Sequence, residues 1–566
     1  MLDIRFLHSL IPVFADKEPK GEKITSVSMC QNQAAHFQMA FKINDQSVKS
    51  TGFYIKLDTD LPISMYYINN VPVMHTSTLE NGASIGLYPD VLLEKSINPS
   101  VENHAFPWHS FMAEQGEDVI LRAFDDSWQA VWFCVNEHGK NVKSGNHIIK
   151  FSLFDSQGNP LNTESFQVEV LPLKLPKQKL MYTNWFHHDC LADTYGHQVF
   201  SERHFEILPD WIEKAARNGM NMIYLPAFTP PLDTGINRER TTMQLVDITK
   251  NKDKYTFDFT RMKRYIDLCK KCGISYFEHA HFFTQWGAEG APKIIVTEMG
   301  KQKKMFGWKA KASGKPYVNF LRQYIVSLKE FLKQEKLENK VLFHISDEPN
   351  QDMVEGYTLA RNAIIDLLDG YMVGDAMSKV LYYEKALCKM PIADVSDIHD
   401  FIGKCDNLWA YYTGGSSLGG KSSRLLTMPR EKNRMMGIQL YYYNIKGFLH
   451  WGYNSCYSEQ SQYKFNALLN PNGGYALPGT SYIVYPALDG SCTQSVRQKT
   501  FFEGLTDMRL LALLEKLKGR EACNALIEKH FGVPHFDKTP NTPDTYIRFL
   551  DELYNDIKGC VTDGIM

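Results

Sequence analysis

Three features are scarce in this sequence of 566 residues, and each absence excludes a class of protein. No run approaches the 18 or more consecutive apolar residues that a membrane-spanning helix needs. Net charge is nearly absent, since 62 Lys and Arg stand against 64 Asp and Glu, so the chain as a whole has no electrostatic reason to bind nucleic acid or an anionic membrane. The 11 cysteines are scattered singly, which favours a reducing compartment over a disulfide framework.

The N-terminus also lacks a convincing secretion signal. The stretch MLDIRFLHSLIPVFADKEPK carries one Arg near its start, and His8 and Pro12 interrupt its apolar run. A signal peptide combines a basic start, an uninterrupted apolar centre and a small-residue cleavage site. We therefore expect a cytoplasmic protein, while secretion stays open because VFA before Asp16 resembles a poor cleavage site.

Aromatic residues, by contrast, are abundant, at 13% of the chain. Their rings stack on sugars and other flat or apolar ligands, and they also fill protein cores. Composition alone leaves both interpretations open.

Residues 1–175 are predicted to form an antiparallel β-sandwich. Short, roughly alternating segments, among them AAHFQMAFKI, QAVWFCVN, HIIKFSLFD and ESFQVEVLPL, alternate with turn-forming residues. Several short strands of this kind are typical of two packed antiparallel sheets. The Pro- and Lys-containing stretch LPLKLPKQK then leads to a segment of different rhythm.

Residues 178–520 are predicted to form a (β/α)8 barrel, because strand-like and helix-like segments alternate along them. Candidate strands lie at 179–187, 221–228, 274–282, 340–346, 379–384, 407–413, 447–453 and 481–486, the fifth and the eighth being the weakest. Candidate helices lie at 204–219, 259–273, 317–336 and 355–370. Residues 521–566 are predicted to be a helical extension packed on the barrel. The expected fold class is therefore α/β, a TIM-like barrel preceded by an antiparallel β-sandwich.

Polar and aromatic side chains collect where the predicted barrel strands end. In such barrels the catalytic groups occupy the carboxyl ends of the strands and the loops that follow. The residues at these positions are Trp185, His187, His188, Asp189, Thr229, His279, His281, Gln285, Trp286, Asp347, Glu348, Tyr411, Tyr412, His450, Trp451, Tyr453 and Asn454. We expect the functional site among them.

The sharpest motif is VLFHISDEPN, residues 341–350. An apolar strand ends in Asp347 and Glu348, and Pro349 stops it. Two carboxyls at a barrel mouth repel one another, which raises the pKa of one and leaves a neutral acid beside an ionised partner. Cleavage of a glycosidic bond needs such a division of labour.

This motif carries a family resemblance. HISDEP, EHAHFFTQWGAEGAPKI upstream of it, and FLHWGYN and FFEGLTDMRLL downstream resemble glycoside hydrolase family 123, the β-N-acetylgalactosaminidases, and the similarity runs over most of the chain. The resemblance implies removal of terminal β-linked N-acetylgalactosamine from glycans or glycosphingolipids, with no cofactor and no metal. It also implies substrate assistance, in which the 2-acetamido oxygen of the sugar attacks C1 to give an oxazolinium intermediate and retained configuration. The acid/base role maps to Glu348, and orientation of the acetamido group maps to Asp347.

The spacing of the two carboxylates agrees with that mechanism. A conventional retaining or inverting glycosidase places its second carboxylate across the sugar from the acid. Adjacent residues lie on one side of the substrate, which suits a nucleophile supplied by the sugar itself. Glu348 would then protonate the leaving oxygen and activate water, while Asp347 would accept the amide N–H and stabilise positive charge.

Sugar recognition is predicted to come from aromatic and histidine side chains at the strand ends. We expect Trp451 to form the floor of the sugar site and Trp185 and Trp286 its walls, with Tyr453 nearby. Tyr411 or Tyr412 would hydrogen-bond the acetamido carbonyl, and only one of them can, since adjacent strand residues alternate faces. His187 and His279 are expected to bind sugar hydroxyls. Packing inside the barrel would explain each of these residues equally well.

Two other functions stay open. His279 and His281 would share one face of a strand and His187, His188 and Asp189 end another, a combination that metal-dependent barrel hydrolases use to activate water. The chain could instead be a carbohydrate-binding protein with an inactive barrel, which the intact pair of carboxylates disfavours. The sequence predicts neither a nucleic-acid partner nor a membrane span, and it leaves the oligomeric state open.

Three further motifs are given ordinary structural interpretations. GSSLGGKS, residues 415–422, fits the phosphate-loop pattern, but Pro429 limits any following helix to about two turns, so we expect a flexible loop over the sugar site. The lysine-rich run 301–315 is expected to be solvated, or else to touch an acidic glycan or lipid headgroup through Trp308. Cys269 and Cys272 end a helical pattern and are expected to lie in the core.

Overall fold

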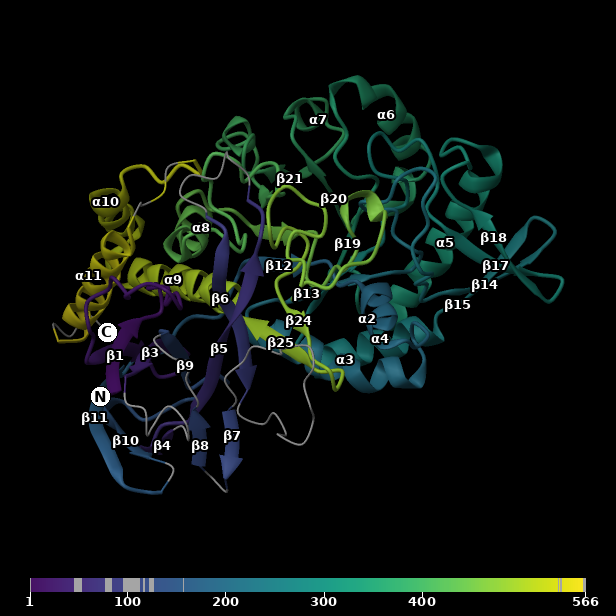
Figure 1. Cartoon of the computed structure of the whole chain (residues 1–566). Coiled ribbons are helices and arrows are strands. Elements are labelled where there is room, and N and C mark those ends of the chain that lie inside the picture. The colour runs from purple at the N-terminus through teal and green to yellow at the C-terminus, as the bar shows by residue number, and fades with distance from the viewer. Residues whose placement is uncertain are drawn as a thin grey trace.

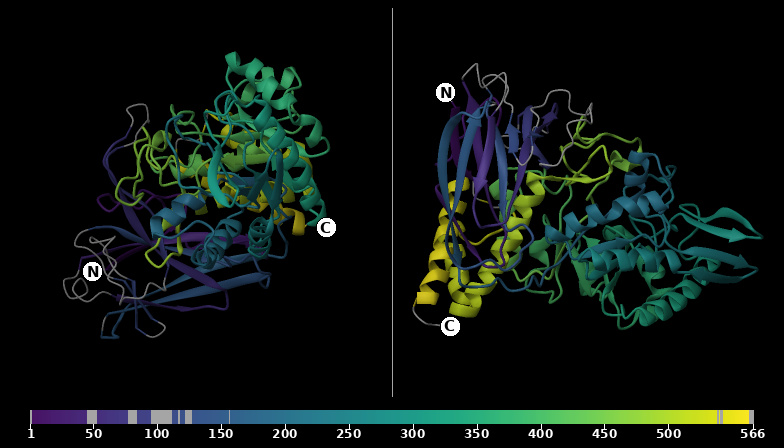
Figure 2. Two further views of the ribbon diagram at one scale, coloured as in Figure 1. Left: turned by 90° about the vertical axis from the view of Figure 1, so that its right-hand side faces the viewer. Right: turned by 90° about the horizontal axis from the view of Figure 1, so that it is seen from below.

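A computed structural model describes residues 2–44, 53–76, 84–94, 112–115, 118–121, 127–155, 157–537, 539 and 542–562. An N-terminal β-sandwich packs beside a barrel, and three C-terminal helices lie along the sandwich (Figure 1). The view from below shows the yellow C-terminal helices beside the purple and blue strands, with the barrel on the other side (Figure 2).

The sandwich consists of two sheets whose neighbouring strands are antiparallel except for β2 and β11. One sheet has the order β1 (Leu2–His8), β3 (Ala35–Ile43), β9 (Gln129–Val135), β5 (Ile63–Val73), β6 (Gly86–Glu94), β25 (Cys492–Ser495) and β24 (Tyr485–Pro486). The other has the order β2 (Ser26–Cys30), β11 (Pro160–Leu171), β10 (Gly145–Asp155), β4 (Phe53–Asp58), β8 (Asp118–Leu121) and β7 (Met112–Gln115). Along β10 every second side chain is buried, as one sheet face turned toward a core requires.

The barrel closes through eight parallel strands. In order these are β12 (Met181–Asn184), β13 (Met222–Leu225), β16 (Tyr276–His279), β19 (Val341–Phe343), β20 (Met372–Met377), β21 (Met390–Asp394), β22 (Trp409–Tyr411) and β23 (Gly447–His450). The helices of the barrel are α2 (His188–Tyr195), α3 (Glu202–Arg217), α4 (Thr260–Lys271), α5 (Lys315–Gln334), α6 (Val354–Asn362), α7 (Leu381–Glu384) and α8 (Arg430–Tyr442). The predicted fold class, a TIM-like barrel after a β-sandwich, is confirmed.

Two of the predicted barrel strands are wrong. Residues 379–384 contain the short helix α7, and residues 481–486 end in β24, which pairs with β25 in the sandwich. A brief apolar run does not distinguish a strand from a short helix. The strands that close the barrel are instead β20, which contains Gly374 and Asp375, and β21, which contains Pro391. Gly, Asp and Pro each argue against a central strand, so the sequence pattern concealed both.

A small sheet projects from the barrel on the side away from the sandwich (Figure 1). It has the order β15 (Lys254–Asp258), β14 (Asp247–Asn251), β17 (Ile294–Glu298) and β18 (Lys301–Phe306). The lysine-rich run therefore begins on an edge strand, where exposed lysines hinder pairing with another chain.

The C-terminal helices join the two larger units. They are α9 (Val496–Lys518), α10 (Arg520–Phe531) and α11 (Pro543–Thr562). Side chains of α9 contribute to the barrel core through Phe501, to a sandwich core through Val496 and to a helical core through Leu510. The predicted domain limits at 175, 178 and 520 stay predictions. Among the helices that the structure describes, none combines the length and the apolar character that crossing a bilayer requires.

Candidate active site

A cavity of about 390 Å³ opens at the carboxyl ends of the barrel strands. Its volume falls in the range that holds a small ligand. Its walls combine carboxyl groups, indole and phenol rings and loop backbone, namely Trp185, Leu232, Asp233, Gln285, Trp286, Asp347, Glu348, Ala376, Tyr411, Thr413, Gly414, Gly415, Leu418, Leu449, Trp451, Glu459, Tyr475, Ala476, Leu477 and Thr480. Both predicted catalytic carboxyls line this cavity.

The backbone around the carboxyl pair is held by hydrogen bonds from neighbouring segments. The Glu348 N–H donates to the Ala376 carbonyl of β20 at 3.0 Å, and the Trp286 N–H donates to the Asp347 carbonyl at 2.9 Å. Glu348 adopts a φ of 44°, in the left-handed region, although it precedes Pro349. Such a conformation is costly for a side chain other than glycine, and it persists where surrounding contacts fix it.

The pKa values of both carboxyl groups are raised above their ordinary values. Burial, followed by repulsion from Glu348, raises the pKa of Asp347 well above its usual range. Burial also raises the pKa of Glu348, although the Tyr411 hydroxyl, which donates to Glu348 Oε1 at 2.6 Å, opposes that rise. The site therefore favours retention of a proton on this pair near neutral pH, which an acid catalyst needs.

A buried network of charged groups lies beneath Asp347. The His344 Nε2 contacts Glu278 Oε1 at 2.7 Å, and its Nδ1 faces Asp375 Oδ1 at 3.5 Å. Burial opposes a charge on His344, but the two carboxylates outweigh it and raise the pKa of His344 to about 10. The resulting imidazolium lowers the pKa of Asp347, against the effects of burial and of Glu348, and so eases its ionisation.

Three tryptophans border the cavity at different depths. Trp185 is 3% exposed and donates from its indole N–H to Glu278 at 2.5 Å, which ties it to the buried network. Trp451 is half-buried and packs beside Tyr475, while Trp286, at 38% exposed, stands at the mouth. The structure thus gathers all three predicted tryptophans, and Trp185 is the deepest of them.

Tyr411 and Tyr412 point to opposite sides of β22 and its continuation, as strand alternation predicts. Tyr411 lines the cavity and donates to Glu348, so its hydroxyl proton is already engaged there. The Tyr412 hydroxyl instead accepts hydrogen bonds from the backbone and side chain of Arg424, each at 3.2 Å.

The structure does not place His279 or Tyr453 in the cavity lining. The His279 ring packs among aromatic side chains, with its Nε2 at 2.8 Å from the Tyr324 hydroxyl of α5, and burial lowers its pKa to about 3. His281, two residues on, stacks on His344 in the barrel interior at 4.4 Å, so the two histidines do not share the common face that we predicted. Tyr453 is fully buried, and its hydroxyl donates to the Trp211 carbonyl at 3.4 Å.

His187 lies next to the cavity but both of its ring nitrogens are used within the protein. Arg240 donates to Nδ1 at 2.8 Å, so the proton is on Nε2, which donates to the Trp451 carbonyl at 2.8 Å. Burial and then Arg240 lower the pKa of His187 to about 4. Its contacts position Trp451 and leave no ring nitrogen for a sugar hydroxyl.

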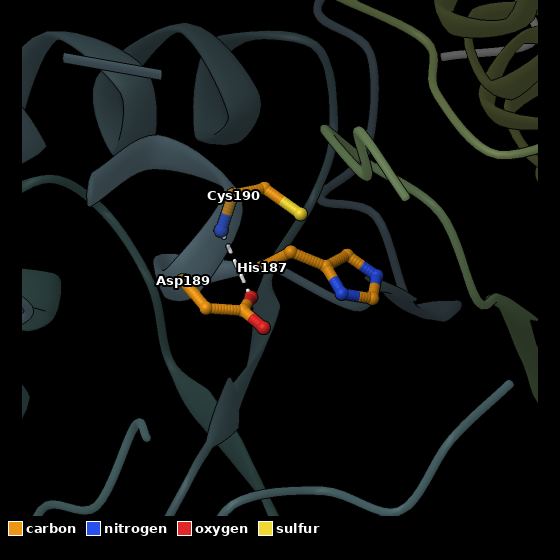
Figure 3. A group of neighbouring side chains, drawn as sticks. All are labelled: His187, Asp189 and Cys190. Carbon is orange, nitrogen blue, oxygen red and sulfur yellow. Dashed lines mark hydrogen bonds between the residues drawn. The ribbon is translucent and has the colours of Figure 1, made fainter. Parts of the chain in front are cut away.

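His187, Asp189 and Cys190 form a compact set of metal-ligand atoms at the start of α2 (Figure 3). The Arg240 guanidinium occupies the position that a cation would take, because it donates to both Asp189 oxygens at 2.7 and 2.8 Å and to Cys190 Sγ at 3.6 Å. A metal ion here would have to displace a buried ion pair, so these residues do not fit the metal-dependent alternative.

Sequence reasoning missed several residues of the cavity wall. Asp233 and Tyr475 lie in loops, and the Tyr475 hydroxyl donates to the Asp233 carboxylate, whose pKa burial raises. Gln285 Oε1 accepts a hydrogen bond from the Asp233 N–H at 2.7 Å. The buried Nε2 of Gln285 has no partner among the described residues. Residues of long loops carry no periodic signal, although Gln285 did belong to the predicted set of strand ends.

The remaining sequence motifs lie where a structural role explains them. Residues 414–420 form turns, and α8 begins at Arg430 rather than at Ser422, so no helix N-terminus receives a phosphate there. Gly415 and Leu418 border the sugar-sized cavity, as a loop over the site would. Cys269 and Cys272 are buried around the end of α4, as expected of core residues.

Comparison with known proteins places this geometry in a family. The structure resembles a family 123 glycoside hydrolase from Clostridium perfringens, described for hydrolysis of glycolipid glycans, with a TM-score of 0.70 and 13% identity over 99% of this chain and 98% of that one. Two other solved structures are too distant to support an argument. One is a β-galactosidase-like protein of Bacteroides fragilis, with a TM-score of 0.31 and 8% identity over 88% of this chain and 61% of that one. The other is a Parabacteroides merdae β-glucuronidase, with a TM-score of 0.27 and 9% identity over 80% of this chain and 49% of that one. No curated protein sequence matches the chain. The glycoside hydrolase 123 catalytic-domain model matches residues 185–514, more than half of the chain, and this enzyme therefore belongs to glycoside hydrolase family 123.

Proposed function

We propose that this glycoside hydrolase is an exo-acting, retaining β-N-acetylgalactosaminidase that uses the acetamido group of its substrate as the nucleophile. The observation that carries the proposal is the pair Asp347 and Glu348, two successive carboxyls in one cavity wall with raised pKa values and separate surroundings. The family 123 enzyme of Clostridium perfringens is described for glycolipid glycans, and we extend that substrate class to this chain.

Glu348 is the group suited to general acid and base catalysis. Its raised pKa keeps a proton available, and Tyr411 on β22 fixes the direction of the carboxyl. In the first step the acetamido oxygen bonds to C1 while the bond from C1 to the glycosidic oxygen breaks, and Glu348 gives its proton to that leaving oxygen. In the second step the Glu348 carboxylate takes a proton from a water molecule whose oxygen bonds to C1. The bond from C1 to the acetamido oxygen breaks, which opens the oxazolinium ring and leaves the β-configuration intact.

Asp347 is suited to hold and polarise the acetamido group. Within the described part of the chain, no protein group donates a hydrogen bond to its carboxylate, which leaves both oxygens for the substrate N–H. The charged His344 beneath it favours the ionised form at the moment when positive charge develops on the acetamido group.

The leaving group is assigned to a second, more open cleft of about 540 Å³. Glu348, Trp286 and Tyr411 border both spaces, so the scissile oxygen would lie at the boundary where the acid is. The lining of this cleft also includes Asp394 and Asp397, and Asp397 forms an ion pair with Lys379 at 3.3 Å. A neutral sugar suits these carboxylates, whereas sialylated or sulfated leaving groups would be repelled.

Asp233 offers a second mechanism, because it is a carboxyl on another wall of the same cavity. As an opposing nucleophile it would make the enzyme a conventional retaining glycosidase. Its oxygens, however, accept hydrogen bonds from Tyr475 and from the Gln460 N–H at 3.0 Å. These hydrogen bonds fix the orientation of the Asp233 carboxylate, and we assign it the role of binding sugar hydroxyls.

The decisive experiment compares 4-nitrophenyl β-glycosides of N-acetylgalactosamine, N-acetylglucosamine and galactose, together with N-fluoroacetyl analogues of the first. If the acetamido oxygen attacks, each added fluorine lowers kcat/KM steeply, and the plain galactoside is cleaved at least about 10³-fold more slowly. Asp347→Asn and Glu348→Gln should each lower turnover by about 10² to 10⁴-fold. Asp233→Asn is the matched control and should act mainly on KM. A fluorine series with no slope, together with loss of activity in Asp233→Asn, would assign the nucleophile to the protein and refute the proposal.

A further inference from the structure

Two histidines and an aspartate from distant segments meet outside the active site. His399 lies in the 3₁₀ helix η3 (Ile398–Asp400), between β21 and β22, while His535 and Asp537 follow α10. One ligand atom from each residue lies within 4.8 Å of those of the other two. Because the segments are far apart in sequence, tertiary packing and not a local turn brings them together.

The backbone of residues 535–537 is fixed to the barrel. Phe536, 1% exposed, stacks on Tyr443 with ring centroids 6.2 Å apart and planes 21° apart. The His535 carbonyl accepts from Gln439 Nε2 at 2.9 Å, and the Phe536 carbonyl accepts from the Ser422 N–H at 3.3 Å. Because the Phe536 side chain points into the core, those of His535 and Asp537 lie toward His399 and solvent.

The three side chains are not committed to other protein groups. Within the described ranges, neither imidazole nor the Asp537 carboxylate makes a hydrogen bond or ion pair to a further side chain, and the two rings lie 4.8 Å apart at 59° without stacking. The set at His187 differs in this respect, since Arg240 neutralises it. Among the described residues, no cationic side chain forms an ion pair with these ligand atoms.

We propose that His399, His535 and Asp537 bind a divalent transition-metal ion, Zn²⁺ above all, as a clamp between the barrel and the C-terminal helices. Two imidazole nitrogens and one carboxylate oxygen suit Zn²⁺ and related ions, whereas Ca²⁺ and Mg²⁺ prefer oxygen ligands alone. His399 and Asp537 are exposed, so water can complete a tetrahedral shell. The ion would hold the segment after α10 against the loop between β21 and β22.

The test uses the full chain, freed of any affinity tag and treated with EDTA and then dialysed. Calorimetric titration should show one Zn²⁺ per chain at micromolar affinity or tighter, and Mg²⁺ should give no heat. The double variant His399→Asn/His535→Asn should bind Zn²⁺ at least about 100-fold more weakly. His138→Asn removes an exposed histidine of the sandwich and serves as the matched control, with binding unchanged.

A stability readout separates a clamp from incidental binding. Saturating Zn²⁺ should raise the unfolding temperature of the wild-type chain by a few degrees and leave that of the double variant unmoved. Co²⁺ in place of Zn²⁺ should give the visible bands of a tetrahedral site with nitrogen and oxygen ligands. Absence of binding at 1 mM Zn²⁺ (about the weakest affinity worth assigning), equal binding by the double variant, or a thiolate-to-cobalt charge-transfer band would each overturn the proposal. Glycoside hydrolysis should be the same with and without EDTA, and its loss on chelation would overturn the purely structural role.

Discussion

Replacing Tyr411 by Phe tests how the proposed acid is tuned, because it removes a single oxygen atom. The Tyr411 hydroxyl donates to Glu348 at 2.6 Å, and that hydrogen bond lowers the pKa of Glu348 against the larger upward effect of burial. Without the donor, the carboxylate form of Glu348 loses stabilisation and its pKa rises further. Glu348 must be protonated to act as an acid, so the basic limb of the pH–rate profile should move to higher pH.

The size of the effect follows from the strength of a hydrogen bond to a charged group, about 1.5–3 kcal/mol. Since 1.36 kcal/mol corresponds to one pH unit, the low end of that range predicts a displacement of the basic limb by about one pH unit. The low end applies because Glu348 is only half-buried and solvent screens part of the interaction.

The assay is kcat/KM for a chromogenic β-N-acetylgalactosaminide between pH 4 and pH 10 (about the range over which carboxyl and histidine groups titrate). Tyr412→Phe is the matched control, because the neighbouring hydroxyl faces Arg424 and not the acid. An unmoved basic limb in Tyr411→Phe, or an equal displacement in both variants, would refute the tuning of Glu348 by Tyr411.

Three further predictions address the surroundings of the site. Arg240→Met leaves the Asp189 carboxylate buried and unpaired, so the free energy of unfolding in urea should fall by about 3–5 kcal/mol. His344→Gln should destabilise the chain most below pH 6.5 and progressively less as the pH rises through about 10. The pKa of His344 is raised by folding, so its charge stabilises the fold fully below the pKa of the unfolded chain and no longer does so above the pKa of the folded chain. Asp397→Asn should improve hydrolysis of substrates with an anionic leaving group at low salt, relative to neutral ones, by a few-fold in kcat/KM.

Each of the three has a result that contradicts it. Unchanged urea unfolding of Arg240→Met would show that Asp189 does not depend on the ion pair. A pH-independent stability difference for His344→Gln would show that this imidazole is neutral in the folded chain. An equal response of neutral and anionic substrates to Asp397→Asn would show that the leaving group does not occupy the acidic cleft.

The sequence predicted the fold class and the placing of Asp347 and Glu348 in one cavity at a strand end, because both have local signatures. The alternation of strands and helices, and a buried strand that ends in two acids and a proline, are visible without tertiary information. The two missing barrel strands were hidden by Gly374, Asp375 and Pro391, residues that disfavour strands on average. Asp375 is tolerated in β20 because it accepts the Tyr357 hydroxyl at 2.5 Å and the Ile345 N–H at 2.8 Å.

The histidines show where reasoning from strand ends stops. His187 and His279 both lie at barrel strand ends, yet neither offers a free ring nitrogen to a ligand. His187 joins Arg240 to Trp451, and His279 contacts the Tyr324 hydroxyl and the Ala280 carbonyl. Spacing gives the height of a residue in a barrel, but the direction of its side chain depends on partners from distant loops. Arg240 is such a partner, and its position in a loop gave no signal in the sequence.

The backbone at Glu348 shows a conflict between local preference and function. A residue before proline favours extended conformations, but Glu348 has a φ of 44°, and Trp286 on the facing loop has a φ of 58°. Each such residue costs on the order of 1–3 kcal/mol, which other contacts must outweigh. Both polar atoms of the peptide that joins Asp347 to Glu348 make such contacts. Its N–H donates to the Ala376 carbonyl, and its carbonyl accepts from the Trp286 N–H. With this left-handed turn, the Glu348 carboxyl reaches the Tyr411 hydroxyl at the border between cavity and cleft, where we propose that it protonates the glycosidic oxygen.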